Sequence, residues 1–587
     1  MCGLAGVLAR PGEEVPEATL DALSRALAHR GPDGEGRFRN GPLAMVHRRL
    51  AIIDLVTGDQ PMTGPSGATL IANAEIYNHV EWRRVLSEVR FATQSDCEVP
   101  LHLFERDGAD FTKGLRGMYA IALWDRAQER LYLARDPFGI KPLYVAETAM
   151  GLAFASEAQA FVASGLVEAA VNDAALGELL QMQFTTGRRT IFQHVERVLP
   201  GETIVVEQGR IVERLRRSAL PELDSANWDE KDAMERLDAA LLDSVRVHER
   251  ADVPYGMFLS GGVDSSTVLA AMARLDDRPV RAYTVGFDIP HARDERRHAA
   301  EVAAAAGADH VEVSFGEDDF WALLPDVAAA MDDPAADYAT LPTYKLARQA
   351  AEDVKVVLSG EGGDELFAGY GRYRRMLRPR LLGGGKLRRK GTFEGLEVLF
   401  DGHAGWRMGL DVAAQAFKKP GRSALQVAQA VDMADWLPND LLTKLDRCLM
   451  AHGVEGRVPL LDNHVADVAW RLPDAMKIRR RQGKWLLRSW LDRELPAADA
   501  FSAKRGFTVP VGEWIARRGA EIGHLVAAQP AIEAIAYPAQ VVRLFEQAAK
   551  KRSGFAAWTL LFYALWHARH IDGVATQGLS VEEALRA

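Results

Sequence analysis

The chain has 587 residues, a formal net charge of −10 at neutral pH and hydrophobic residues at 48% of its positions. The acidic balance disfavours nucleic acid as a main partner, and the apolar content is ample for large cores. Only three cysteines occur, with no CxxC spacing, so neither a disulfide framework nor a structural zinc site is expected. The first residues lack the features of a standard signal peptide, and the longest apolar stretch, 555–566, is too short to span a bilayer. We therefore expect a cytoplasmic enzyme with no membrane partner.

The chain begins Met1-Cys2-Gly3, so removal of Met1 would make Cys2 the N-terminal residue. Its own α-amine, which titrates at about 7.7–8.0, could then accept the thiol proton at neutral pH. A nucleophile with a built-in base is one known solution to activation. Short strands are predicted downstream over 118–124, 131–134, 152–155 and 203–206, with a helix over 17–28. Cys2 is therefore a candidate nucleophile at the start of a layered sheet domain.

Four blocks follow Cys2 in order: HRGPD at 29–33, RLAIID at 49–54, NAEIYNH at 73–79 and SDCE at 95–98. Each block alone could be turn or cap chemistry. Together they resemble the glutaminase domain of class II glutamine amidotransferases. The resemblance implies an N-terminal-nucleophile hydrolase, an α+β sandwich in αββα layers, which splits glutamine into glutamate and ammonia. It implies that Cys2 is the nucleophile and that Asn73 and Ala74 donate to the oxyanion. The residues that it implies for glutamine binding are Arg49, Ile52, Asn73, Glu75 and Asp96.

The chemistry fits these roles, because an amino-acid zwitterion needs a guanidinium fork for its carboxylate and carboxylates for its ammonium group. Fixed donors to the oxyanion are each worth on the order of 10²–10³ in rate. Ala74 stands where the family pattern has glycine. Alanine keeps the backbone N–H, but a positive φ there would cost about 1–2 kcal/mol. We predict a working glutaminase, and a slow one if that backbone is strained.

A second signal lies past residue 250. A predicted strand over 255–259 leads into SGGVDSS at 260–266 and a helix over 267–275, an arrangement that directs backbone N–H groups and a helix dipole at an anion. No Gly-Lys pair followed by Ser or Thr occurs here, so the loop is not a Walker motif. Another predicted strand, 354–358, leads into SGEGGDE at 359–365. Both loops should emerge where ligands bind to a parallel sheet. Asp264 and Asp364 could then hold Mg²⁺, leaving Glu361 for acid–base work.

SGGxDS resembles the pyrophosphate loop of ATP pyrophosphatases, which adenylate an acceptor. With LDR at 445–447, AHGVEGRVPLLD at 451–462 and GKWLLR at 483–488, the chain resembles the glutamine-hydrolysing asparagine synthetases along nearly its whole length. This resemblance implies ATP and Mg²⁺, an aspartyl-AMP intermediate attacked by ammonia from an internal tunnel, and allows a homodimer. It implies that Lys484 stabilises the phosphates and that Glu361 is the base. It implies that Asp264 and Asp364 bind the metal ion. It assigns ATP contacts to Leu259, Ser260, Gly261, Gly262, Asp264, Ser265, Ser266, Val285, Ser359 and Gly360.

These patterns predict a glutaminase domain over 2–215, a charged linker over 216–232 and an ATP-dependent synthetase domain over 233–587. In the last of these, alternating strands and helices predict an α/β doubly wound parallel sheet, followed by a mainly helical C-terminal part from about residue 425. The basic stretch 372–390 is predicted to be an exposed, mobile loop. A second interpretation makes it a lid over the ATP phosphates.

The acceptor is the least determined part of the reaction. Aspartate is favoured, and residues 337–344 and the motif near Gly453 could line its pocket. The alternative is a relative that amidates another carboxylate, such as a modified amino acid, a peptide or a sugar acid. A β-lactam-forming relative typically lacks the glutaminase nucleophile, and a phosphoribosyl amidotransferase lacks the second loop. A non-catalytic sensor of glutamine and ATP is disfavoured because the acidic and lysine residues of the synthetase motifs are intact.

Overall fold

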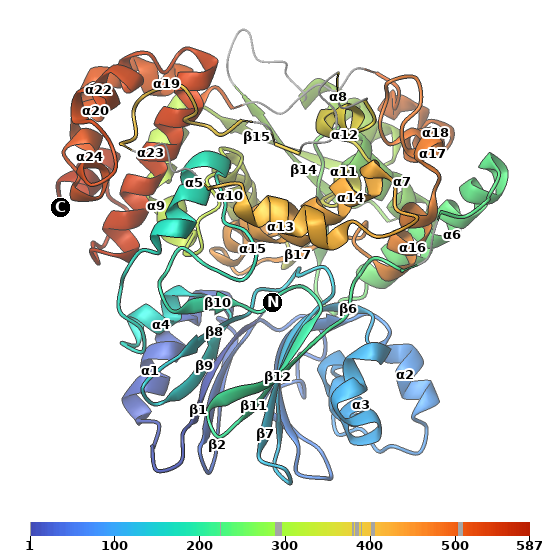
Figure 1. Cartoon of the computed structure of the whole chain (residues 1–587). Helices are drawn as coiled ribbons and strands as arrows, with labels where there is room; N and C mark the ends of the chain where they lie inside the picture. The colour runs from blue at the N-terminus through green and yellow to red at the C-terminus, as the bar shows by residue number, and fades with distance from the viewer. Residues whose placement is uncertain are drawn as a thin grey trace.

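The computed structural model describes residues 2–222, 225–276, 278–287, 296–378, 381, 387–388, 390–400, 405–502 and 509–587. Its N-terminal part contains two six-stranded antiparallel sheets that pack face to face (Figure 1). The first has the order β10 (Val195–Arg197), β8 (Tyr144–Glu147), β9 (Gly151–Ala155), β1 (Gly3–Ala9), β3 (Leu43–Arg49) and β2 (Gly34–Asn40). The second has the order β12 (Arg210–Arg216), β11 (Glu202–Glu207), β7 (Arg130–Arg135), β6 (Gly117–Asp125), β5 (Thr69–Ile76) and β4 (Met62–Thr63).

Helices cover the outer faces of both sheets, which gives the predicted αββα layers (Figure 1). On β6, Ala122 and Trp124 belong to the core between the sheets, whereas Ile121 and Leu123 face the helical side. A strand buried on both faces has a continuous run of apolar residues, which explains why β6 was predicted from the sequence. The helices are α1 (Glu17–Ala26) and α4 (Gln159–Ala163) on the first sheet, and α2 (His79–Val85) and α3 (Val99–Asp107) on the second, with α5 (Asp173–Met182) further along the chain.

The C-terminal part is built on a five-stranded parallel sheet with the order β15 (Asp309–Phe315), β14 (Arg281–Phe287), β13 (Tyr255–Phe258), β16 (Val356–Leu358) and β17 (Glu455–Arg457). In chain order the strands read 3-2-1-4-5, so the order reverses between β13 and β16. Open α/β sheets bind ligands at such a reversal, outside the carboxyl ends of the strands. The loops after β13 and β16 are the two glycine-rich motifs.

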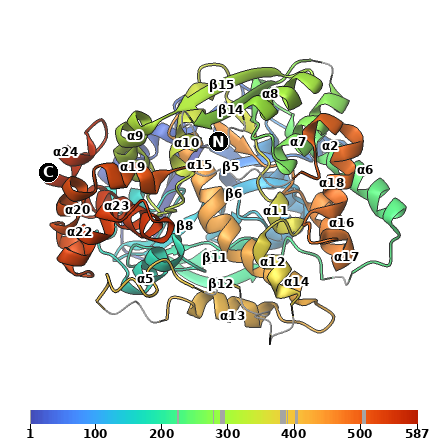
Figure 2. The same cartoon turned by 90° about the horizontal axis from the view of Figure 1, so that it is seen from above.

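Helices surround this sheet and form the rest of the C-terminal part (Figure 2). They are α6 (Glu230–His248), α7 (Val263–Leu275), α8 (Arg296–Ala305), α9 (Glu317–Ala330), α10 (Thr340–Ala350), α11 (Gly363–Leu366), α12 (Gly371–Met376), α13 (Met408–Phe417), α14 (Ala424–Val431), the π-helix η5 (Asp432–Leu441) and α15 (Leu442–Met450). They continue with α16 (Asn463–Arg471), α17 (Asp474–Lys477), α18 (Trp485–Glu494), α19 (Val511–Arg517), α20 (Gly519–Ala527), α21 (Pro530–Glu533), α22 (Pro538–Glu546), α23 (Lys551–His570) and α24 (Val581–Arg586). The apolar stretch 555–566 lies inside α23 and is buried. Among the described helices, none combines the length and apolar character that crossing a bilayer requires.

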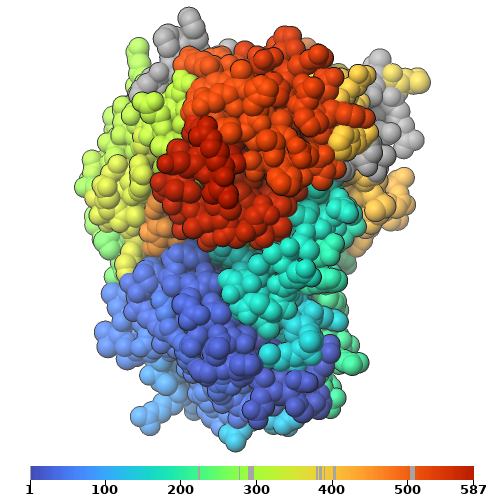
Figure 3. All heavy atoms as spheres, turned by 90° about the vertical axis from the view of Figure 1, so that its left-hand side faces the viewer, coloured from blue at the N-terminus to red at the C-terminus, as the bar shows by residue number. Residues whose placement is uncertain are grey.

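The two parts meet across buried ion pairs. Arg30 of the N-terminal part lies 2.7 Å from Glu157 and 2.8 Å from Asp446 of the C-terminal part. Arg447 continues the network to Asp332, at 2.6 Å. Figure 3 shows the N-terminal part, in blue and cyan, in close contact with the red C-terminal helices. Removing one partner of such a pair typically costs about 3–5 kcal/mol, so the network fixes how the two parts sit together.

The basic stretch 372–390 differs from its prediction. The stretch begins inside α12, which contains Arg372. The Nε of Arg372 lies 2.9 Å from Asp432, and its guanidinium lies 3.7 Å from the ring centre of Tyr370. Arg388 packs 3.9 Å from the ring centre of Trp436. The prediction of an exposed loop was wrong for these two arginines, because aromatic faces and a buried carboxylate hold them. Residues 379–380, 382–386 and 389 lie outside the described residues, and the lid stays a prediction.

Candidate active sites

The predicted nucleophile lies between the two antiparallel sheets. Cys2 directly precedes β1, and its backbone nitrogen donates a hydrogen bond to Asn73 Oδ1 on β5, at 2.9 Å. Its Sγ lies 3.8 Å from the carbonyl oxygen of Leu50. Burial raises the pKa of the Cys2 thiol. A thiol in this environment is protonated at neutral pH, and removal of Met1 would place a free amine, the predicted base, on the same residue.

Two groups on β5 are suited to bind an oxyanion. Asn73 Oδ1 is used by Cys2, while the buried Asn73 Nδ2 has no hydrogen-bond partner among the described residues. Buried donors are nearly always paired, so an unpaired one beside the nucleophile is consistent with a role in binding. Ala74 lies within β5 in extended backbone, outside the left-handed region. The strain that its methyl group would cause at positive φ is therefore absent.

Arg49, the predicted clamp for the glutamine carboxylate, is the last residue of β3. Its Nη1 lies 2.7 Å from Asp59 Oδ1, and its Nη2 donates to the carbonyl oxygen of Asp54 at 2.5 Å. These two contacts restrain the guanidinium. The pairing of β1 with β3, with Gly3 opposite Arg48, places the backbone of Arg49 beside Cys2. Ile52 is buried nearby, and its carbonyl oxygen accepts a hydrogen bond from the backbone N–H of Asp252 in the C-terminal part.

The two carboxylates predicted to hold the glutamine amino group are both buried. Glu75 Oε2 lies 2.9 Å from Arg457 Nη2 on β17, and Asp96 Oδ2 accepts a hydrogen bond from the Ile76 backbone N–H at 2.6 Å. Burial raises the pKa of both carboxyl groups, although the charge of Arg457 opposes this. The predicted glutaminase residues therefore converge on one site, but Glu75 already has a cationic partner from the other part of the chain.

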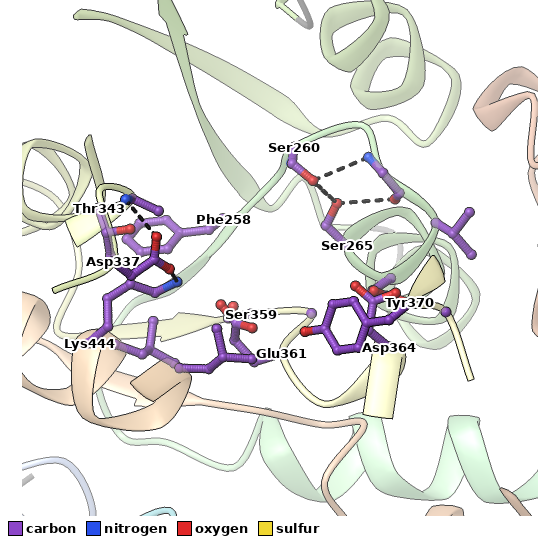
Figure 4. Close-up of a pocket in the computed structure, with 18 of the residues that line it drawn as sticks. Phe258, Ser260, Ser265, Asp337, Thr343, Ser359, Glu361, Asp364, Tyr370 and Lys444 are labelled. Atoms are coloured by element: carbon purple, nitrogen blue, oxygen red, sulfur yellow. Dashed lines mark hydrogen bonds and ion pairs between the residues drawn. The ribbon is translucent and has the colours of Figure 1, made fainter. Parts of the chain in front are cut away.

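The first phosphate-type loop follows β13 and leads into α7. Ser260 Oγ lies 3.0 Å from Ser265 Oγ and accepts a hydrogen bond from the backbone N–H of Gly262 at 3.2 Å (Figure 4). Gly261 has a φ of +68°, a conformation that side-chain-bearing residues rarely adopt. These features curl the backbone at the N-terminus of a 13-residue helix, whose dipole favours an anion there.

Most of the predicted ATP contacts line a single cavity of about 830 Å³ at the reversal of strand order. Of the ten predicted contact residues, Ser266 alone is absent from its wall, because it lies buried in α7 behind the loop. The size is suitable for a small-molecule site. The predicted site residues that do line the wall are Leu259, Ser260, Gly261, Gly262, Asp264, Ser265, Val285, Ser359 and Gly360, together with Glu361, Asp364 and Lys484.

Lys484 joins the two acidic loops. Its Nζ contacts Asp264 Oδ2 and lies 2.5 Å from Asp364 Oδ1. Burial opposes its charge, but the two carboxylates prevail and raise the pKa of Lys484. Its backbone φ is +58° at the start of α18, a conformation that costs a non-glycine residue about 1–2 kcal/mol. Backbone strain of this kind is concentrated at functional sites.

The opposite end of the cavity contains Asp337 and Lys444 (Figure 4). Burial raises the pKa of Glu361, which lines the wall between the two ends. Lys444 Nζ lies 3.1 Å from Asp337 Oδ2. The predicted pocket residues 337–344 contribute to this wall, but Gly453 does not, and a side chain at that position would contact Pro32 of the N-terminal part. The sequence analysis missed Lys444, although it lies directly before the recognised LDR motif.

Two family profiles match the chain. The profile described as "Asparagine synthase" matches residues 236–568, and the one described as "Glutamine amidotransferase domain" matches residues 1–216. The glutamine-hydrolyzing asparagine synthetase 1 of Bacillus subtilis is 31% identical, over 97% of this chain and 97% of that protein. The glutamine-hydrolyzing asparagine synthetase B of Escherichia coli is 29% identical, over 88% and 83%. The amidase chyE of Penicillium rubens is 31% identical, over 64% and 60%. The chain therefore belongs to the asparagine synthase family.

Proposed function

We propose that this chain makes asparagine from aspartate, ATP and glutamine. Glutamine is hydrolysed at Cys2, and the ammonia attacks an aspartyl-AMP intermediate in the C-terminal cavity. The products are asparagine, AMP, pyrophosphate and glutamate. The observation that carries this proposal is the joint presence of a buried cysteine beside an unpaired amide donor and a cavity with two acidic loops joined by one lysine.

In the glutaminase half, the α-amine of Cys2 takes the thiol proton, and the sulfur attacks the amide carbon of glutamine. Asn73 Nδ2 and the backbone N–H of Ala74 donate to the oxygen as it gains charge. The carbon–nitrogen bond then breaks, ammonia leaves with the transferred proton, and water frees the thioester to give glutamate. Arg49 holds the substrate carboxylate, and Asp96 and Glu75 hold its ammonium group.

In the synthetase half, a carboxylate oxygen of aspartate attacks the α-phosphorus of ATP and pyrophosphate leaves. The loop Ser260–Ser265 and Lys484 neutralise the phosphates while this occurs. Ammonia then attacks the acyl carbon, AMP leaves, and Glu361 accepts the proton that the new amide nitrogen loses. We further propose that the ammonia passes between the sites inside the protein, because in water it would be protonated and no longer nucleophilic.

The donors present fit Mg²⁺. Asp264 and Asp364 are brought together on two neighbouring loops, and this ion commonly takes one or two carboxylates plus substrate phosphate oxygens. Within the described residues no group of three or more His, Cys, Asp or Glu side chains is suited to hold a metal unaided. Asp264 and Asp364 would hold Mg²⁺, which supplies positive charge against the phosphates when bound.

Pyrophosphate and AMP release tests this function. Purified protein should release both with aspartate and ATP when glutamine or ammonium is the nitrogen donor. Cys2→Ser should lose the glutamine-dependent reaction and keep the ammonium-dependent one. A protein that releases no pyrophosphate with aspartate from either donor contradicts the proposal.

A second candidate keeps the same chemistry and changes the acceptor. It is favoured by one finding, the similarity to a fungal protein named as an amidase rather than an asparagine synthetase. Under this proposal another carboxylic acid is amidated. A panel of amino acids, dicarboxylates and sugar acids in the pyrophosphate assay separates the two, because the true acceptor should give the highest kcat/KM.

A further inference from the structure

The cavity extends past Glu361, away from the phosphate loops. At that end it is lined by Asp337, which precedes α10, and by Lys444 on α15. Trp436 on the π-helix η5 also lines the cavity, and its Nε1 donates a hydrogen bond to Tyr370 Oη at 3.3 Å. Figure 4 shows Asp337 and Lys444 on one side of Glu361 and Asp364 on the other. A carboxylate held near Glu361 would therefore have the rest of its molecule in reach of this end.

Arg388 also lines the cavity, and its guanidinium is incompletely paired. Its Nε and Nη2 are buried and have no hydrogen-bond partner among the described residues. The group lies 3.9 Å from the ring centre of Trp436 and 5.1 Å from that of Phe184, so two aromatic rings restrict its plane. A guanidinium fixed in this way is pre-organised to bind a carboxylate with two parallel hydrogen bonds.

Asp337 lines this end of the cavity, and Asp440 is buried behind the wall. Asp337 Oδ1 accepts a hydrogen bond from the Ala339 backbone N–H at 3.0 Å, and Oδ2 lies 3.1 Å from Lys444 Nζ. Asp440 is fully buried, and neither of its carboxylate oxygens has a hydrogen-bond partner among the described residues. Burial, with the nearby charge of Asp337, raises the pKa of Asp440 well above its ordinary value, although Lys444 and Arg388 oppose this. The carboxylate that an added ammonium group would meet on the cavity wall is therefore that of Asp337.

The π-helix explains why these groups meet. Such helices are rare and occur often at functional sites. In η5, Asp435 Oδ1 accepts from the Gly187 backbone N–H at 2.7 Å, and Asn439 Nδ2 donates to the Thr185 carbonyl oxygen at 3.1 Å. The N-terminal part therefore holds the segment that carries Trp436 to the cavity wall.

We propose that this end of the cavity is the acceptor subsite, where Arg388 binds the α-carboxylate and Asp337 the α-ammonium group of an amino-acid acceptor. The side-chain carboxylate of that acceptor then faces Glu361 and the phosphate loops. A sugar acid or a simple dicarboxylate lacks the ammonium group and leaves Asp337 without its ligand. The inference rests on the proposed function and extends it, because it names the residues that select the acceptor.

Three acceptors test the contacts of Arg388 and Asp337 separately. Ammonium is the nitrogen donor, so the assay does not depend on glutamine hydrolysis. Aspartate offers both groups, succinate lacks the ammonium group, and β-alanine lacks the α-carboxylate. Pyrophosphate release gives kcat/KM for each in wild type, Arg388→Met, Arg388→Lys and Asp337→Asn. The matched control is Arg375→Met, which removes an exposed arginine on α12 that does not line the cavity.

Arg388→Met should raise KM for aspartate at least tenfold and reduce the preference for aspartate over β-alanine. Asp337→Asn should instead reduce the preference for aspartate over succinate. Arg388→Lys keeps the positive charge but loses the two parallel hydrogen-bond donors, so it should raise KM for aspartate by less than Arg388→Met does. It replaces Arg388→Met in the test if the methionine variant does not fold. KM for ATP and the glutaminase rate should stay within about twofold of wild type, which shows that the fold is intact.

Two outcomes would overturn the subsite. In the first, wild type uses aspartate but both variants match Arg375→Met. In the second, each variant lowers kcat/KM for all three acceptors equally, as a purely structural role would. A wild-type protein that releases no pyrophosphate with aspartate overturns the proposed function itself, and the subsite with it.

Discussion

The guanidinium of Arg457 lies 2.9 Å from the carboxylate of Glu75 and so joins the two halves of the enzyme at their active sites. Arg457 ends β17, which pairs with β16, the strand that leads into the loop of Glu361. The backbone N–H of Ser359 donates to the Arg457 carbonyl oxygen at 2.8 Å. A continuous chain of contacts therefore connects the loop of Glu361 through β17 to Glu75, one of the residues predicted to bind glutamine.

Arg457→Met should weaken both the fold and the glutaminase. The change leaves the buried Glu75 without the cation beside it and removes one of the cations near Glu455, and the free energy of unfolding should fall by about 3–5 kcal/mol. Urea unfolding measures this loss, and Arg543→Met on the exposed side of α22 is the matched control. In Arg457→Met/Glu75→Gln part of the loss should be recovered. Purely additive effects of the two substitutions would show that the pair does not interact.

Asn73→Ala should lower the glutaminase kcat by about 10²–10³ without changing ammonium-dependent synthesis. The reason is the loss of Nδ2, the unpaired donor beside Cys2. Asn73→Asp keeps an acceptor for the Cys2 nitrogen and removes the donor, so it should be impaired as well. If Asn73→Asp retains the wild-type rate, the donor has no part in binding the oxyanion.

Ala74→Gly should leave the glutaminase rate within about twofold of wild type. Ala74 lies in extended backbone, so glycine relieves no strain, and the N–H is present in both residues. The only expected change is a loss of stability of about 0.5–1 kcal/mol, because glycine gains backbone freedom when the protein unfolds. A rate increase of tenfold or more would mean that the methyl group obstructs the site.

The sequence was most informative where a local pattern and the tertiary environment agree. The loop after β13 was predicted because strand, glycines and helix follow one another along the chain, although α7 begins at Val263, inside the motif and earlier than the predicted 267. The glutaminase residues were found through their resemblance to a family, since no periodicity relates Cys2 to Asn73, 71 residues away. Only the sandwich brings β1 and β5 together.

Other features could not be predicted, because their causes lie far along the chain. β17 is three residues long, and its charged residues Glu455 and Arg457 are fully buried because they pair with each other and Arg457 also pairs with Glu75 of the other part. A short charged segment of this kind has the composition of an exposed turn. Arg372 and Arg388 were assigned to a solvated loop because the distant groups that hold them, Trp436 for both and Asp432 for Arg372, belong to another segment. The π-helix has the composition of an ordinary helix and depends on contacts with residues 185–187.

Asp435→Asn should stabilise the protein at high pH. Burial, with the nearby charge of Glu178, raises the pKa of Asp435 to about 6 in the folded state, against its ordinary value of 3.8. Below pH 3.8 the residue is protonated in both states and carries no penalty. As the pH rises through 6, the folded state is destabilised by up to about 3 kcal/mol, because it must ionise a carboxyl group that the unfolded state ionises more easily.

Asparagine retains an oxygen that can accept from the Gly187 N–H and never ionises, so the variant should gain most of this free energy at pH 8 and little near pH 4. Urea unfolding at both pH values measures the difference. The exposed Asp492→Asn on α18 is the control and should show no such pH dependence. If Asp435→Asn is less stable than wild type by the same amount at both pH values, then Asp435 is ionised and stabilising in the folded protein. Its contact with residue 187 would then be a charge-assisted hydrogen bond that holds the π-helix.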